Sequence, residues 1–339
     1  MEEWSIVHKV ALWGFLGAFL FGIIAHKTHF CTMGAISDWI NMGSLVRLRA
    51  WLLAMAVALL MSQLLQAIGW IDLSASIYLS TNFGIGGHIV GGLLFGVGMT
   101  LGGGCGQRTL VRAGGGNLKS LVVLLVLGLT AYITLRGLLA GVRIEVFEPL
   151  SIDLSEYALA DQSLATILAA VTGIATERVA IGLAVIIVLT LLIYTLKDKD
   201  FRTNGDAIVS GLAVGLLVAG AWFVTGVVGN DDFDPVRLET LTFIAPVGNM
   251  LNYLMTWTGS TIGFGIAVVF GVLAGSLAYA FTSGNFRIET FSSRSDMLNH
   301  LYAGVLMGFG GVLSLGCTIG QGVGGFSTLA LGSVISIVF

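Results

Sequence analysis

The feature that most constrains this chain is a series of long apolar runs. A helix needs about 20 mostly apolar residues to cross the hydrocarbon core of a bilayer. We expect about nine such spans, at 10–25, 50–70, 84–101, 119–142, 178–196, 206–228, 260–282, 299–315 and 323–339. Only 10% of the 339 residues are charged, whereas soluble domains carry about 25%. The sequence therefore predicts an all-α, polytopic integral membrane protein and excludes a soluble globular one.

Glycine is the second unusual feature of the composition. The chain has 48 glycines, roughly twice the usual frequency of about 7%. Glycine allows close helix contacts in membranes, and it lets the backbone turn at membrane depth where the turn lines a cavity. Because the runs that end near Cys105 and Cys317 are short, we expect broken or re-entrant helices there.

The chain contains an internal repeat. At an offset of 212 residues, segments 88–105 and 300–317 are identical at eight of 18 positions, including a histidine and a cysteine. We therefore expect one membrane domain, 1–339. It comprises a first repeat half 1–142, a connecting segment 143–204 with one span, and a second half 205–339. Counting spans places the two copies in opposite directions, which predicts an inverted repeat with substrate bound near the midplane between the halves.

The charges between the spans are distributed unevenly. Basic residues concentrate in four segments, 26–49, 107–119, 197–202 and 284–297. Acidic residues dominate two others, 143–177 and 230–239. Because cytoplasmic loops carry an excess of lysine and arginine, we place the basic segments in the cytoplasm. The acidic segments and the amino terminus are then outside.

Three cysteines are the candidate functional residues. Cys31, Cys105 and Cys317 each lie close to a glycine, where a helix break is expected, and within a few residues of a hydroxyl or amide side chain. A buried cysteine can simply fill a packing gap. A thiol is also a weak donor with a polarizable sulphur, which suits a soft sulphur atom in a substrate. No C-x-x-C motif or metal-ligand spacing occurs, so we expect no metal and no cofactor.

Residues next to these cysteines can contribute hydrogen-bond donors for an anion. Backbone N–H groups around Gly104, Gly106 and Gly316 can bind negative charge. The amides of Gln107 and Gln321 can donate to sulphonate-like oxygens, or they can form hydrogen bonds between helices instead.

Two arginines follow the second cysteine. Arg108 and Arg112 would attract an anion on the cytoplasmic side. They also fit ordinary positive-inside topology. The glycine strings lack a following Walker lysine and a βαβ context, so they do not predict a nucleotide site, and we expect no nucleic-acid partner.

The cysteine motifs carry a family resemblance. FCTMGAISD at 30–38, GGGCG at 102–106 and GCTIGQG at 316–322 resemble the YeeE/YedE family of sulphur-transport proteins. The resemblance implies thiosulfate uptake across the bacterial inner membrane, with Cys31, Cys105 and Cys317 contacting thiosulfate in turn. It also implies a cytoplasmic partner, a small sulfurtransferase-like protein of the TusA type. Some relatives are associated with selenium metabolism.

Three alternatives to a thiosulfate transporter remain at this point. The chain could carry another anion, such as sulphite, hydrosulphide or a selenium compound. A membrane thiol oxidoreductase would need a reactive cysteine pair, and the sequence has no C-x-x-C. A purely structural subunit would not need paired glycine and cysteine motifs. We therefore expect a transporter rather than an enzyme.

Overall fold

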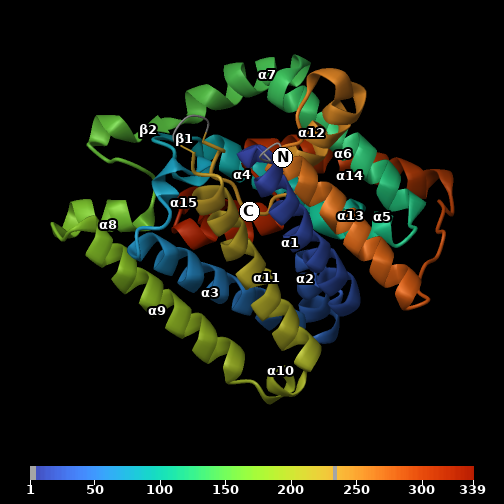
Figure 1. The fold of residues 1–339 in the computed structure, drawn as a ribbon, viewed down its shortest axis with the longest axis horizontal. Helices are drawn as coiled ribbons and strands as arrows, with labels where there is room; N and C mark the ends of the chain where they lie inside the picture. The colour runs from blue at the N-terminus through green and yellow to red at the C-terminus, as the bar shows by residue number, and fades with distance from the viewer. Residues whose placement is uncertain (1–4, 232–234) are drawn as a thin grey trace.

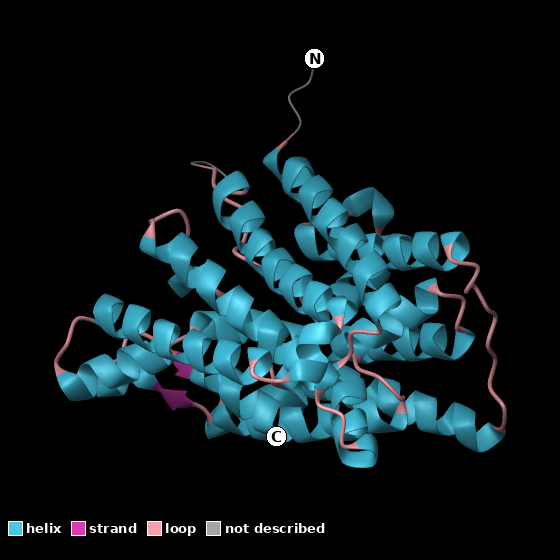
Figure 2. Cartoon of the chain, turned by 90° about the horizontal axis from the view of Figure 1, so that it is seen from below, coloured by secondary structure: helices cyan, strands magenta, loops and turns pink. Residues whose placement is uncertain are grey.

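The protein is an almost wholly helical bundle (Figures 1 and 2). The structure is a computed structural model, and it describes residues 5–231 and 235–339. The acidic residues Asp232 and Asp234, which we placed in an outer segment, and the first four residues of the amino terminus lie outside this range. The expectation of an all-α membrane protein is confirmed.

The described residues form helices of very different lengths. The α-helices are α1 (Ile6–Thr28), α2 (Thr32–Met42), α3 (Val46–Ala67), α4 (Ile85–Leu101), α5 (Gly106–Gly114), α6 (Leu118–Arg136), α7 (Leu138–Val142), α8 (Leu164–Thr172), α9 (Thr176–Leu196), α10 (Lys199–Thr203), α11 (Gly205–Phe223), α12 (Ala245–Met255), α13 (Phe264–Thr282), α14 (Arg294–Leu313) and α15 (Leu331–Val338). Single π-helical turns follow α7 and α11, and another, Gly320–Gly325, follows α14. Two short strands, β1 (Asn82–Phe83) and β2 (Ile152–Asp153), pair antiparallel with Asn82 opposite Asp153.

Seven segments of the described chain are long and apolar enough to cross a membrane. They are Ile6–Met42, Val46–Ala67, Ile85–Gly114, Leu118–Arg136, Thr176–Leu196, Gly205–Val228 and Phe264–Thr282. The expected count of about nine is not confirmed. The expected span 299–315 lies in α14, whose first turn carries Arg294 and Asp296. The expected span 323–339 is interrupted, because Leu329 adopts a left-handed conformation (φ 61°) and the following helix α15 has only eight residues.

Close helix pairs hold the bundle together, and glycines make the close approach possible. The main pairs are α1 with α13, α3 with α11, and α4 with α14. A Cβ at Gly275 in α13 would lie 2.0 Å from the carbonyl oxygen of Phe19 in α1. A Cβ at Gly215 in α11 would lie 2.7 Å from the carbonyl oxygen of Ala54 in α3. By contrast, α9 runs along the outer edge of the bundle beside α3 (Figure 1).

Helices α4 and α14 pack antiparallel. Gly87, near the start of α4, lies against Leu313 at the end of α14, and Gly102, just past the end of α4, lies against Ala303. Between these contacts, the Cβ position of Gly91 is 2.7 Å from the carbonyl oxygen of Gly310. The two segments that the sequence repeat relates are therefore in direct contact.

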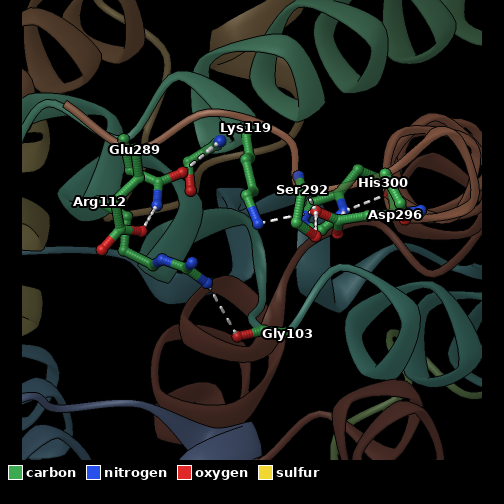
Figure 3. A network of polar contacts seen from close by, with 10 residues as sticks. Gly103, Arg112, Lys119, Glu289, Ser292, Asp296 and His300 are labelled. Atoms are coloured by element: carbon green, nitrogen blue, oxygen red, sulfur yellow. Dashed lines mark hydrogen bonds and ion pairs between the residues drawn. The ribbon is translucent and has the colours of Figure 1, made fainter.

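The four basic segments converge on one side of the bundle. Ion pairs join Lys27 to Asp206 (3.6 Å) and Arg49 to Asp198 (2.7 Å). On the same side, Lys119 pairs with Asp296 at 2.7 Å, within the polar network of Figure 3. The imidazole of His26 packs against Gly115, which links the first of these segments to the second. We call the side of the bundle formed by these four basic segments the basic face.

A candidate anion path at three helix breaks

Each of the three cysteines lies where one helix ends and the next begins. Cys31 separates α1 from α2, and Cys105 separates α4 from α5. Cys317 separates α14 from the helical turn that contains Gly320–Gly325. All three are free thiols and are buried, with 6%, 0% and 2% of their surfaces exposed.

The three breaks share a backbone conformation. The residue two positions before each cysteine is left-handed: His29 (φ 52°), Gly103 (φ 65°) and Leu315 (φ 60°). Glycine adopts this conformation at no steric cost, whereas other residues store about 1–3 kcal/mol of strain when they are held in it. Such strain persists where the surrounding structure requires the geometry, which is common at functional sites.

The same hydrogen bonds close the helices before Cys105 and Cys317. The N–H of Gly104 donates to the carbonyl of Met99 (3.0 Å), and the N–H of Gly316 donates to the carbonyl of Gly311 (2.8 Å). These two N–H groups therefore already donate to backbone carbonyls. The N–H of Gly106 differs, because it belongs to the first turn of α5, where an α-helix supplies no acceptor.

The thiols lie close to one another. Cys31 and Cys105 are within hydrogen-bonding reach, and Cys317 is near enough to interact electrostatically with Cys105. The N–H of Gly34 donates to the sulphur of Cys31, and the N–H of Gly320 donates to the sulphur of Cys317, both at 3.4 Å. These bonds fix each sulphur as an acceptor and leave its S–H group to donate.

Two cavities approach this group of thiols from opposite sides. The larger cavity has a volume of about 1100 Å³, and both acidic segments contribute to its lining. It reaches Gly316, next to Cys317. The smaller cavity, about 220 Å³, lies on the basic face and is lined by Cys31 together with Lys27 and Arg47. Cys105 has no exposed surface, so the two cavities are separated at the thiols.

A family model described as sulphur transport matches residues 27–339, a range that includes all three cysteines. The chain belongs to this family. The thiosulfate transporter TsuA of Escherichia coli (strain K12) is 26% identical over 336 residues, which cover 93% of this chain and 87% of the relative. The thiosulfate transporter TsuA of Spirochaeta thermophila is 25% identical over 330 residues, which cover 96% and 94%. The resemblance inferred from the cysteine motifs is thus confirmed.

In this sulphur-transport chain, Gln107 and Gln321 form hydrogen bonds that stabilise the helix breaks. Gln107 donates to the carbonyl of Phe30 (3.4 Å) and accepts from the thiol of Cys105 (3.8 Å). Gln321 donates to the carbonyl of Ser314 and accepts from the hydroxyl of Ser333. These contacts fit the packing alternative, and direct contact between either amide and a substrate stays a prediction.

The two predicted arginines lie in different surroundings. Arg108 approaches His29 (3.4 Å) and interacts electrostatically with Cys31 and Cys105. Arg112 instead donates to the carbonyl of Gly103 (3.4 Å), the left-handed residue before Cys105 (Figure 3). The structure therefore brings Arg108 to the thiols and places Arg112 where it supports the helix break.

The sequence analysis missed the charged residues of the larger cavity. Arg136, Arg143 and Arg237 line it together with Glu148 and Glu239. Burial raises the pKa of the Glu239 carboxyl, and the nearby charge of Arg237 opposes this. The sequence did contain a signal for these cationic residues, because Arg143 and Arg237 lie inside segments that are otherwise acidic.

Proposed function

We propose that this protein imports thiosulfate along a path from the larger cavity, past Cys317, Cys105 and Cys31, into the smaller cavity. The observation that carries the proposal is the row of free thiols between two cavities that are lined by cationic side chains. The names of the two relatives support thiosulfate as the substrate.

The chemistry of the path suits a small sulphur anion. A dianion is costly to move into a low-dielectric interior without compensating donors. Arginines at the larger cavity raise the local anion concentration, and thiols then supply weak donors to its terminal sulphur. Weak donors spread over several sites bind the anion without trapping it, and conduction requires both binding and release.

We also propose that the two halves form an inverted repeat. Contacts between α4 and α14 occur in pairs: when each residue of one contact is replaced by its repeat equivalent, 212 residues away, the other contact of the pair results. These pairs are Gly91–Ser314 with Gly102–Ala303, and Gly98–Met307 with Phe95–Gly310. A pseudo-two-fold axis that relates the two segments would produce such paired contacts. Because α4 and α14 are antiparallel, this axis is perpendicular to the helices and therefore lies in the plane of the membrane. A structure in which α4 and α14 ran parallel would contradict this proposal.

We propose that the basic face is cytoplasmic and the larger cavity opens to the outside of the inner membrane. In a cysteine-free background, Glu156→Cys is expected to react with an impermeant thiol reagent added to intact cells. Asp200→Cys is expected to react only after the cells are permeabilised. Both positions are exposed, so the side of the membrane on which each position lies decides whether the reagent labels it. The opposite labelling pattern would reverse the direction of the path.

A cytoplasmic TusA-type sulfurtransferase is the partner that the family resemblance supports. We propose that it receives the imported sulphur at the basic face, beside the smaller cavity. Co-purification of such a protein with the detergent-extracted chain is the expected result. Recovery of the chain without it, after mild crosslinking in cells, would contradict this partner.

Uptake in cells tests the transport proposal. Cells that lack other routes for thiosulfate and express this chain are expected to accumulate radiolabelled thiosulfate. Unlabelled sulphite, hydrosulphide and selenium anions are added as competitors, and each is expected to compete less well than unlabelled thiosulfate. Stronger competition by one of them would identify that anion as the substrate instead.

A further inference from the structure

One buried hydroxyl beside the thiols has no oxygen or nitrogen partner. The Oγ1 atom of Thr318 is shielded from solvent and forms no hydrogen bond with an oxygen or nitrogen atom of the residues that the structure describes; the group it meets is the sulphur of Cys105, a weak acceptor. Buried polar groups are nearly always paired, because leaving one unpaired is costly. Buried threonines in helices usually bond to the carbonyl four residues earlier, as Thr134 does to Thr130 (2.7 Å). Thr318 does not, because it begins its helix and no helical turn precedes it.

The position of this hydroxyl links two of the thiols. Thr318 follows Cys317 in the sequence, and its side chain lies beside the sulphur of Cys105. Cys105 in turn lies within reach of Cys31. The unpaired hydroxyl is therefore at the step between the outermost thiol and the central one.

The same arrangement occurs a second time. Thr32 follows Cys31, is 9% exposed, and also has an Oγ1 atom without a partner in the described parts of the chain. Cys105 is followed instead by Gly106, which has no side chain. Two of the three cysteines are thus followed by a threonine whose hydroxyl has no oxygen or nitrogen partner in the described chain.

We propose that the hydroxyl of Thr318 binds the oxygen end of the transported anion as the anion passes Cys105. This inference rests on the proposed function and names a specificity-determining residue within it. Thiosulfate has one soft terminal sulphur and three oxygens. A thiol is suited to the sulphur, and a hydroxyl is the stronger donor for an oxygen. The hydroxyl of Thr32, beside Cys31, binds the same oxygen end of the anion at the next position along the path.

The test compares three variants in thiosulfate uptake and in thermal unfolding in detergent. Thr318→Val keeps the shape of the side chain and is expected to lower uptake about tenfold or more. Its melting temperature is expected to stay the same or rise, because an unpaired buried hydroxyl is removed. Thr318→Ser keeps the hydroxyl and is expected to retain most uptake. Thr134→Val, whose hydroxyl is paired internally, is expected to transport normally.

The outcomes separate this inference from the proposed function. If the unmodified protein takes up no thiosulfate, the proposed function fails and this inference fails with it. If the unmodified protein is active and Thr318→Val equals it, only the inference is wrong. Equal loss of uptake in Thr318→Val and Thr318→Ser would also overturn it, because shape rather than the hydroxyl would then matter.

Discussion

Cys105→Ala is expected to reduce thiosulfate uptake about tenfold or more while leaving the protein folded. Cys105 is fully buried, lies within reach of Cys31, and is near Cys317. A hydrogen bond to a charged group contributes about 1.5–3 kcal/mol, and a tenfold change corresponds to about 1.4 kcal/mol. If the Cys105 thiol turns from Gln107 to the passing anion, its loss at this fully buried point of the path produces a large effect on transport.

The measurement is initial uptake of labelled thiosulfate, with monodisperse elution in detergent as the control for folding. Cys31→Ala and Cys317→Ala are also expected to lose most uptake, because each removes a neighbouring thiol. Near-normal uptake by the Cys105→Ala and Cys317→Ala variants would contradict the role of the thiols. A disulfide between any two of the three cysteines in the resting protein would contradict it as well.

Gly275→Ala is expected to prevent correct assembly of the bundle. A Cβ there would lie 2.0 Å from the carbonyl oxygen of Phe19, so α1 and α13 would have to separate. Because the obstructing atom belongs to the backbone, a rotamer change cannot relieve the clash. Overpacking typically costs about 1–3 kcal/mol and occasionally more, and a clash with backbone belongs at the upper end.

A matched substitution on the periphery provides the control for Gly275→Ala. Gly182 lies in α9, and apart from its chain neighbours and the backbone of its own helix no atom of the described residues is within 4 Å of its Cβ position. Gly182→Ala is expected to be neutral or to stabilise the helix by up to about 1 kcal/mol. Both variants are compared by gel filtration and melting temperature in detergent. A Gly275→Ala protein as stable as the Gly182→Ala protein would contradict the close α1–α13 contact.

Hydropathy and rare residues predicted the membrane class, the all-α fold and the family. Hydropathy was less informative about helix continuity, because it reports whether a segment suits lipid and not whether its backbone is unbroken. The carboxyl-terminal run 323–339 shows the difference, since it has no charged residue and yet is interrupted at Leu329.

The candidate site was only partly predictable, for physical reasons. The glycines near Cys105 indicated a helix break, but His29 and Leu315 adopt the same left-handed conformation without being glycine. The arginines of the larger cavity come from segments distant in the sequence, so only packing brings them together. Whether the hydroxyl of Thr318 meets an oxygen or nitrogen partner likewise depends on tertiary packing.

The most direct test of thiosulfate transport uses purified protein in liposomes, where no other transporter is present. Labelled thiosulfate is added outside, and accumulation inside is followed over time. The account predicts saturable uptake well above that of protein-free liposomes, with little uptake by liposomes containing the Cys105→Ala variant. Uptake equal to that of protein-free liposomes, by protein that is monodisperse and correctly inserted, would contradict it.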